Sequence, residues 1–160
     1  RFANGFIKGF ITRAFSHTGP RRGKNFSISS DAFQIARMVK GLQEKKLLIG
    51  NLTTTRVVMD VRDTVGAYYK AMINPKVNNQ IFNVCGEMPR KMQFFTDKLI
   101  EISGLKGVKQ EVHQPFWRPH EIFYQHGDST NLKEMTGFKE EFNIEETLND
   151  LLKYWFNKIN

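Results

Sequence analysis

The arginines are the residues of this sequence whose type and placement best suit a chemical role. They are scattered along the chain, and several stand beside glycine, proline or aspartate in segments that read as turns. Lysine and arginine outnumber aspartate and glutamate by 24 to 16, which gives a net charge of +8. Because a guanidinium group donates two parallel hydrogen bonds to a phosphate, arginines that converge from separate turns indicate a concave anion site. The arginines concerned are Arg13, Arg21, Arg22, Arg37, Arg56, Arg62, Arg90 and Arg118.

The same excess of positive charge has two other readings. It fits a solvated basic surface, on which Arg56 and Arg62 pair with the aspartates at 60 and 63. It also fits a nucleic-acid site, but such a site crowds lysine and arginine along one helix or interleaves them with aromatic residues. The scattered pattern matches neither description, so we expect a small phosphorylated ligand and no nucleic-acid partner.

Metal binding, disulfide formation and membrane insertion are not expected. His113, His120 and His126 lie in irregular segments without a partner cysteine or helical i, i+4 pairing, which argues against a metal site. The single Cys85 excludes an internal disulfide and suits a reducing compartment, for which the cytoplasm is the default. No run of about 18 apolar residues occurs, so we expect no membrane-spanning segment.

Short apolar runs alternate with amphipathic helical patterns along the chain, which favours an α/β fold. The patterns predict strands over residues 10–15, 47–49, 57–61, 81–84 and 108–112. They predict a helix from about Asp31 that Gly41 can stop, a helix between Val61 and Pro75, a helix from Met92 that stops at Gly104, a short helix from Asn131 to Met135, and a last helix capped by Asn143.

Local residue types add further expectations. Residues 16–20 read as a turn that ends the first strand, Ser30 can cap the first helix, and Glu146 completes a variant capping box at the last helix. The apolar stripes of the helices are core by default. In the second helix that stripe consists of Val65, Tyr68, Tyr69 and Met72.

The stretch 13–23, Arg-Ala-Phe-Ser-His-Thr-Gly-Pro-Arg-Arg-Gly, resembles a segment of the extended short-chain dehydrogenases that act on nucleotide sugars. GDP-mannose 4,6-dehydratases carry Asn-His-Glu-Ser-Pro-Arg-Arg-Gly there, and related 4-keto-sugar reductases carry Asn-His-Thr-Gly-Pro. Further motifs follow in the family's order, so the resemblance covers essentially the whole chain. They are Gly50-Asn51-Leu52, Arg56, Asp60-Val61-Arg62-Asp63, Ile81-Phe82-Asn83-Val84-Cys85-Gly86, Arg118-Pro119, Gly127-Asp128 and Thr136-Gly137-Phe138.

The resemblance implies an α/β fold that is the C-terminal, substrate-binding portion of a Rossmann-type extended short-chain dehydrogenase. Most of the N-terminal dinucleotide-binding domain would be lacking. Residues 1–160 would form a single nucleotide-sugar-binding segment. Within it, residues 1–30 would hold the last Rossmann strand and the following loop, and residues 31–160 the substrate-binding lobe.

No catalytic residue is assigned. The chain contains no Gly-X-X-Gly-X-X-Gly or Gly-X-Gly-X-X-Gly fingerprint of a dinucleotide cradle. The family's catalytic Tyr-X-X-X-Lys would precede Arg1, which reads as an internal start because it is not methionine. Tyr154 and Lys158 have that spacing, but they stand on the predicted last helix beside Trp155, so we interpret the match as a coincidence.

The resemblance also implies a set of substrate-binding residues. Arg56 and Arg118 would come from separate segments to grip the diphosphate of the sugar nucleotide. Asn51 and Leu52 would lie near the base or ribose. Ser16 stands where the family carries an asparagine that helps to hold the sugar-diphosphate, and it takes that place in the predicted site.

Two further residues are candidates for contact with a nicotinamide cofactor, which would be NAD or NADP. The family's loop after the first strand passes the nicotinamide, so His17 could lie there, although it reads equally well as a turn histidine. Arg22 lies in the following basic loop, from which it could reach either ligand.

The resemblance therefore implies the substrate-binding part of an NAD(P)-dependent nucleotide-sugar 4,6-dehydratase, cytoplasmic and not catalytic alone. A 4-keto-6-deoxy-sugar reductase or an epimerase fragment is the alternative: residues 17–20, His-Thr-Gly-Pro, favour the reductase, and residues 21–23, Arg-Arg-Gly, the dehydratase. A non-catalytic binding or interaction remnant also stays open, because Ser16 and Val57 replace family residues. The expected partners are a nucleotide-diphosphate sugar and either a second copy of the chain or the lacking N-terminal domain.

Overall fold

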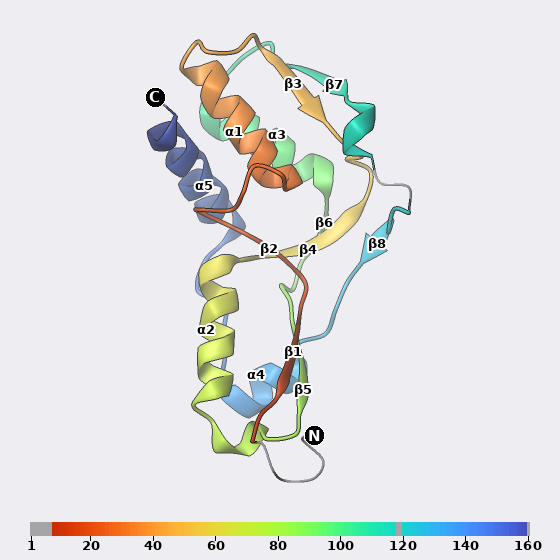
Figure 1. Cartoon of the computed structure of the whole chain (residues 1–160), viewed down its shortest axis with the longest axis vertical. Helices are drawn as coiled ribbons and strands as arrows, with labels where there is room; N and C mark the ends of the chain where they lie inside the picture. Colours follow the sequence, from red (N-terminus) through yellow and green to blue (C-terminus); the bar gives the residue numbers. More distant parts are fainter. Residues whose placement is uncertain (1–7, 118–119, 160) are drawn as a thin grey trace.

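The computed structural model describes residues 8–117 and 120–159, and it shows an α/β fold of short, mostly parallel strands and α-helices. Figure 1 shows that the molecule has two halves, which are joined by strands that cross its middle. The three-helix half contains α1 (Ser27–Val39), α3 (Met92–Ser103), α5 (Ile144–Lys158), β3 (Lys46–Ile49) and β7 (Lys109–Val112). The two-strand half contains β1 (Ile11–Ala14), β5 (Ile81–Val84), α2 (Val61–Met72) and α4 (Thr130–Thr136). Between them run β2 (Ser16–Thr18) and β4 (Thr55–Asp60), with β6 (Pro89–Lys91) and β8 (Tyr124–Gln125) paired to β4.

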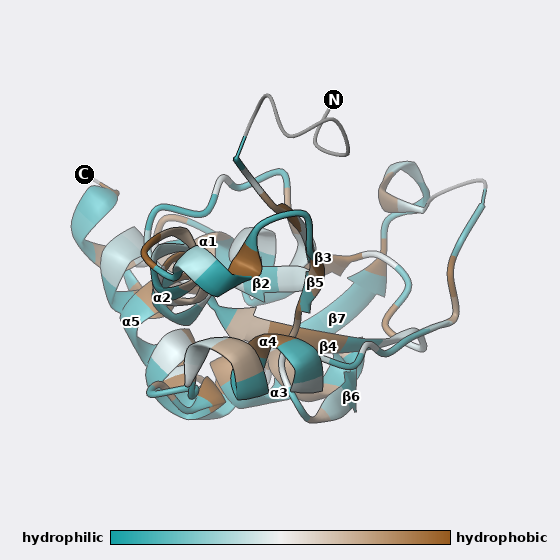
Figure 2. Ribbon diagram, turned by 90° about the horizontal axis from the view of Figure 1, so that it is seen from below, coloured by the Kyte–Doolittle hydropathy of each residue, from teal (hydrophilic) through white to brown (hydrophobic). Residues whose placement is uncertain are grey.

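Parallel pairing organises each of the small sheets. β1 pairs with β5, β2 with β4, and β3 with β7, all in parallel, while β6 joins β4 antiparallel. β4 is also the partner of β8, which brings residues near 124 back to the start of β4. Figure 2 shows β4 as a hydrophobic ribbon in the middle of the molecule, between helices. The central strand therefore gathers segments that lie far apart in the sequence.

The three-helix half has a closed core. Its fully buried side chains come from all three helices and from β3, and they include Ile35, Leu47, Phe95, Leu99 and Leu148. α5 begins with the predicted capping box, in which Asn143 and Glu146 each accept a backbone N–H of the other. The amide side chain of Gln34 donates to and accepts from the backbone of Leu48, with both distances at 2.9 Å, so it ties α1 to β3 as a strand neighbour would.

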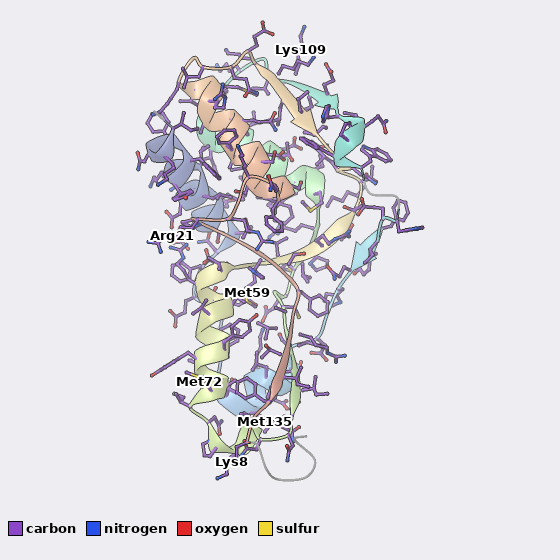
Figure 3. All side chains as sticks on the ribbon, viewed as in Figure 1. Lys8, Arg21, Met59, Met72, Lys109 and Met135 are labelled. Atoms are coloured by element: carbon purple, nitrogen blue, oxygen red, sulfur yellow. The ribbon has the colours of Figure 1, made fainter. Side chains whose placement is uncertain are left out.

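The two-strand half has a smaller core, built from Met59, Ala67, Phe82, Leu132 and Phe138 among others. The predicted apolar face of the second helix is confirmed at Tyr68, which is half-buried against this core, and is wrong at its other three residues. Its Val65, Tyr69 and Met72 are 59%, 57% and 67% exposed, and Figure 3 shows Met72 on the side of α2 that faces away from β1 and β5. α2 packs instead through its small and polar side, which includes Asp63, Thr64, Ala67 and Ala71, because small residues let the helix lie close against the neighbouring strands.

Three element boundaries also differ from the sequence prediction. α1 begins at Ser27 rather than near Asp31, and the predicted cap Ser30 lies inside the helix. β2 forms at 16–18, where a turn was predicted, because Ser16 pairs with Val58 of β4. β4 runs from 55 to 60 rather than from 57 to 61. The first strand is predicted correctly in position, but it is not buried, since Ile11 is 44% exposed. No helix in the described part of the chain is long and apolar enough to span a membrane.

Candidate functional site

A cavity of about 1040 Å³ lies where the central strands meet the three-helix half. Its wall is formed by β2, the basic loop after it, the first turns of α1, the segment between β3 and β4, and the residues Pro115, Phe116, Trp117 and Glu121. Five predicted site residues line it together: Ser16, His17, Arg22, Asn51 and Arg56. These residues come from two stretches of sequence about 30 residues apart, and the parallel pairing of β2 with β4 brings them together.

The remaining two predicted site residues are placed differently. Leu52 is 6% exposed and packs in the core of the three-helix half, so it lies behind Asn51 and not on the cavity wall. Its carbonyl accepts the backbone N–H of Gln93 at 3.1 Å, which joins it to the start of α3. Arg118 lies outside the described residues, and its role stays a prediction.

Arg56 is held at the cavity wall by an ion pair. Its Nη2 lies 3.1 Å from Oε1 of Glu121, which also lines the cavity, and its Nη1 donates to the carbonyl of Thr55 at 2.8 Å. The side chains of Arg56 and Glu121 are only 14% and 18% exposed. The guanidinium of Arg56 and the carboxylate of Glu121 thus face the same cavity, where solvent screens their charges less than on an open surface.

The alternative of surface pairing holds for Arg62 but not for Arg56. Arg62 binds Asp60 and Asp150 through its guanidinium, each at 2.8 Å, away from the cavity. Burial alone would raise the pKa of Asp60, but hydrogen bonds from Arg62 and Thr147 lower it overall. Arg62 is therefore a structural arginine, and it offers an internal control for Arg56.

Arg22 is oriented by stacking. Its guanidinium lies 3.5 Å from the centre of the Phe26 ring, and its Nη1 is 3.4 Å from Nε2 of His17. Nδ1 of His17 lies 3.1 Å from the carbonyl of Phe15, which accepts hydrogen bonds only, so the neutral imidazole carries its proton on Nδ1 and leaves Nε2 as an acceptor. Burial lowers the pKa of Arg22, but guanidinium stays charged at neutral pH.

Two buried polar groups on the wall were not predicted. Burial raises the pKa of Asp31 to about 7, and the hydrogen bond that it accepts from the Thr96 hydroxyl at 2.7 Å opposes that change. The hydroxyl of Thr18 is buried and has no hydrogen-bond partner among the described residues. Of these two residues, Asp31 could have been recognised from the sequence, because its carboxylate lies on the helix whose apolar stripe begins at the next residue, Ala32.

The segment after β7 supplies the other residues that the sequence reasoning missed. Phe116, Trp117 and Glu121 all line the cavity, and none of them was assigned a role. A signal was present for Glu121, an acidic residue three positions after Arg118 of the Arg-Pro motif. No cluster of three or more histidine, cysteine or acidic side chains that could hold a metal is found within residues 8–117 and 120–159.

Comparison with known families identifies the chain. Residues 5–151 match the family model described as GDP-mannose 4,6 dehydratase. The chain belongs to the GDP-mannose 4,6-dehydratase family. This confirms the resemblance to the extended short-chain dehydrogenases that act on nucleotide sugars, and it confirms the α/β fold as a partial Rossmann-type domain.

Two relatives show what similar proteins do. GDP-6-deoxy-D-mannose reductase from Pseudomonas aeruginosa is 30% identical over 151 residues, which are 93% of this chain and 48% of the reductase. GDP-mannose 4,6 dehydratase 2 from Arabidopsis thaliana is 30% identical over 133 residues, which are 82% of this chain and 35% of that protein. The chain thus spans half or less of the length of these relatives.

Solved structures support the same placement. RMD from Pseudomonas aeruginosa, complexed with NADPH, has a TM-score of 0.84 and 31% identity over 94% of this chain and 49% of its own. UDP-glucuronic acid 4-epimerase from Bacillus cereus, in complex with UDP-glucuronic acid and NAD, has a TM-score of 0.79 over 94% of this chain and 46% of its own. At 19% identity, the epimerase shows the shared fold alone.

Proposed function

We propose that this chain is the substrate-binding part of an NAD(P)-dependent enzyme that acts on a nucleotide-diphosphate sugar, and that its cavity holds the diphosphate. The observation that carries the proposal is the position of Arg56, whose largely buried guanidinium faces a cavity of about 1040 Å³. Arg22 and Lys24 line the same cavity, so cations reach it from two segments. A diphosphate needs such converging donors.

The polar side chains at the wall have donors left for a ligand. Oδ1 of Asn51 accepts from the backbone N–H and the hydroxyl of Thr53, at 3.0 and 2.7 Å, and its amide N–H groups have no acceptor among the described residues, so they can donate into the cavity. Ser16 contributes a hydroxyl from β2. In this proposal Arg56 and Arg118 bind the diphosphate, while Asn51 and Ser16 orient the rest of the ligand.

The reaction class is the finer part of the proposal. We assign the 4,6-dehydratase reaction, because the matching family model carries that description and residues 21–23 follow the dehydratase pattern. A nucleotide 4-keto-6-deoxy-sugar reductase is the second candidate. It is favoured by residues 17–20, His-Thr-Gly-Pro, and by the similarity to the Pseudomonas reductase over 93% of the chain.

The cofactor assigned to the complete enzyme is NAD or NADP, which supplies hydride transfer when bound. His17, whose Nε2 is 3.4 Å from Nη1 of Arg22, and Thr18, whose buried hydroxyl has no hydrogen-bond partner among the described residues, are neighbours in β2 and line the cavity, and they fit the polar edge of such a group. Arg22 would hold a negative charge beside them. This chain carries no dinucleotide fingerprint, so we propose that it contributes cofactor contacts without a cradle.

Calorimetric titration with GDP and UDP tests the binding role. A charge-assisted hydrogen bond contributes about 1.5–3 kcal/mol, so Arg56→Ala should weaken binding by about tenfold or more, and Arg118→Ala by a similar factor. Arg62→Ala is the matched control, because Arg62 pairs with Asp60 and Asp150 outside the cavity. Equal affinity of wild type and Arg56→Ala would remove Arg56 from the site. A folded chain that binds neither nucleotide would favour an interaction remnant instead.

Turnover assays test the claim that this segment is not catalytic alone. We expect no dehydratase, epimerase or reductase activity from the purified chain with NAD or NADP and a nucleotide sugar. The reason is that neither the cofactor fingerprint nor the family's catalytic Tyr-X-X-X-Lys is assigned in it. Sustained turnover under these conditions would contradict the assignment, and mutation of Tyr154 would then show whether the motif on α5 supplies the base.

A further inference from the structure

Trp117 is an aromatic residue on the cavity wall to which neither the motifs nor the proposed function gives a role. It lines the cavity together with Phe116 and Asn51, and it is 46% exposed. In the part of the chain that the structure describes, no aromatic ring and no cation stacks on its indole. Because an open indole keeps apolar area in contact with water, Trp117 offers a flat surface to a ligand ring.

The other tryptophan of the chain shows the contrast. The ring of Trp155 on α5 meets the ring of Phe33 at 5.1 Å and that of Tyr154 at 5.2 Å, both edge to face. Its indole N–H donates to the hydroxyl of Ser29 at 2.9 Å. Packing between helices thus explains the position of Trp155, whereas the described residues show no comparable stacking or hydrogen bond for the indole of Trp117.

On its N-terminal side, the segment that carries Trp117 is fixed against the end of β3. The backbone N–H of His113 donates to the carbonyl of Ile49 at 2.8 Å. The backbone of Phe116 then approaches Gly50 so closely that a Cβ added there would lie 3.2 Å from the carbonyl oxygen of Phe116. Figure 1 shows the short helix η3 (Gln114–Phe116) beside the end of β3. Trp117 follows directly after η3.

On its C-terminal side, the same segment is fixed against β4. The backbone N–H of Thr55 donates to the carbonyl of Phe123 at 2.8 Å, and β8 continues the pairing. The ion pair between Arg56 and Glu121 lies between these anchors. Trp117 therefore lies next to the anchor at β3, Glu121 lies near the anchor at β4, and both line the cavity that Arg56 also lines.

We propose that Trp117 is a specificity-determining residue that stacks on the base of the bound nucleotide, with the diphosphate directed toward Arg56. This rests on the proposed function, since it needs a nucleotide in the cavity. Aromatic side chains stack on any base, and the larger face of a purine gains more contact with an indole than a pyrimidine does. Loss of the Trp117 ring should therefore weaken the binding of a purine nucleotide more than that of a pyrimidine nucleotide.

The test separates the base from the phosphates. The 160-residue chain is titrated by calorimetry with GDP and, in parallel, with pyrophosphate, which has two phosphates and no base. Trp117→Ala should weaken GDP binding by about five- to a hundredfold and leave pyrophosphate binding within about twofold of wild type. Trp117→Phe should restore most of the GDP affinity because it keeps a ring. Trp155→Phe serves as the control variant, and circular dichroism confirms that each variant is folded.

Fluorescence provides an independent readout of the stacking. The chain contains two tryptophans, so Trp117 is the single emitter in the Trp155→Phe variant. Stacked guanine should quench this emission in proportion to GDP bound, whereas saturating pyrophosphate should leave it nearly unchanged. UDP should bind with a smaller loss on Trp117→Ala than GDP, because its base covers less of the indole.

Each alternative result overturns the stacking role. Unchanged GDP affinity in Trp117→Ala would overturn it while the diphosphate site at Arg56 remained. An equal loss for GDP and pyrophosphate would show that Trp117 shapes the cavity rather than contacting the base. A folded wild-type chain that binds neither ligand would overturn the proposed function, and the stacking role with it.

Discussion

The two halves of this molecule differ in how they cover their apolar surface. In the three-helix half, side chains such as Ile35, Leu47 and Leu99 are fully buried by partners from the same half. In the two-strand half, Ile11 of β1 and Ile81 of β5 lie opposite each other and are 44% and 52% exposed. Large exposed apolar patches usually mark surfaces that another protein segment covers. The core of the three-helix half is thus closed by its own side chains, whereas the paired strands of the other half leave apolar side chains exposed.

The two-strand half also exposes apolar side chains on α2, on the side of that helix that faces away from β1 and β5. Within the described residues, β1 has one hydrogen-bonded neighbour, β5, so its other edge offers unpaired backbone groups. α2 adds the exposed side chains Val65, Tyr69 and Met72. The cavity, by contrast, takes most of its wall from the three-helix half and the central strands. Ligand binding should therefore depend on the three-helix half, and association on the two-strand half.

Matched truncations in the two halves should give the largest difference. Phe95→Ala removes a ring that is 1% exposed in the three-helix core, and it should lower the free energy of unfolding by about 3–5 kcal/mol. Met72→Ala removes a side chain that is 67% exposed, and it should change that free energy by at most about 0.5 kcal/mol. Chemical denaturation measures both. A similar cost for the two variants would contradict the contrast between the halves.

Asp31 should make the stability of the three-helix half depend on pH. Its folded pKa of about 7 lies above the ordinary value of 3.8, so the folded chain holds a proton that the unfolded chain releases between these values. Stability contributed by this group is therefore present at low pH and is lost as the pH rises toward 7. Asp31→Asn should be more stable than wild type by about 1–3 kcal/mol at pH 8, with a smaller difference at pH 5.

Thermal unfolding of wild type and Asp31→Asn across this pH range checks the prediction. Thr96→Val is the second variant, because it removes the hydroxyl that donates to Asp31. An equal loss of stability of Asp31→Asn at all pH values would contradict the prediction. It would mean that the carboxylate is ionised in the folded chain and that its titration does not change the stability of the contact between α1 and α3.

Substitutions that alter association of the folded chain should have a smaller effect than the substitutions above that alter its stability. We predict that the isolated chain self-associates at tens of micromolar concentration through the exposed strands and α2. Tyr69→Lys should shift sedimentation toward the monomer by roughly tenfold in dissociation constant, because it places a charge on the apolar stripe. Leu42→Lys, at a residue that is 45% exposed in the three-helix half, should leave association unchanged. A monodisperse wild-type monomer with a sharp melt would contradict the prediction.

The sequence predicted much of the fold because most of its signals are local. The capping box of Asn143 and Glu146 and the alternation of strand and helix patterns were confirmed. The burial of α2 was not predictable, since periodicity shows that Val65 and Tyr69 share a face but not whether that face meets protein. α1 starts early because Ser29 bonds to the Arg22 carbonyl and to Trp155, contacts that depend on distant packing.

The candidate site was predictable only where motifs carried it. Arg56 and Asn51 followed from their motifs, and the structure places both on one cavity. Leu52 was assigned with its neighbour, but consecutive residues point to opposite sides of an extended segment, so it enters the core. Glu121 depends on the pairing of β8 with β4, which joins residues about 70 apart, and Trp117 depends on the contacts of η3 with the end of β3; neither contact has a local signal in the sequence.

Mapping of amide chemical shifts on the labelled chain during a GDP titration tests the central claim most directly, because it reads both halves at once. The account predicts saturable shifts at Ser16–Thr18, Asn51, Arg56 and Trp117, the residues around the cavity. It predicts no shifts in α2 and α4 beyond those of a phosphate-only control. Shifts confined to α2, α4 and β1, or no saturable shifts in a folded chain, would contradict a nucleotide-diphosphate site in this cavity.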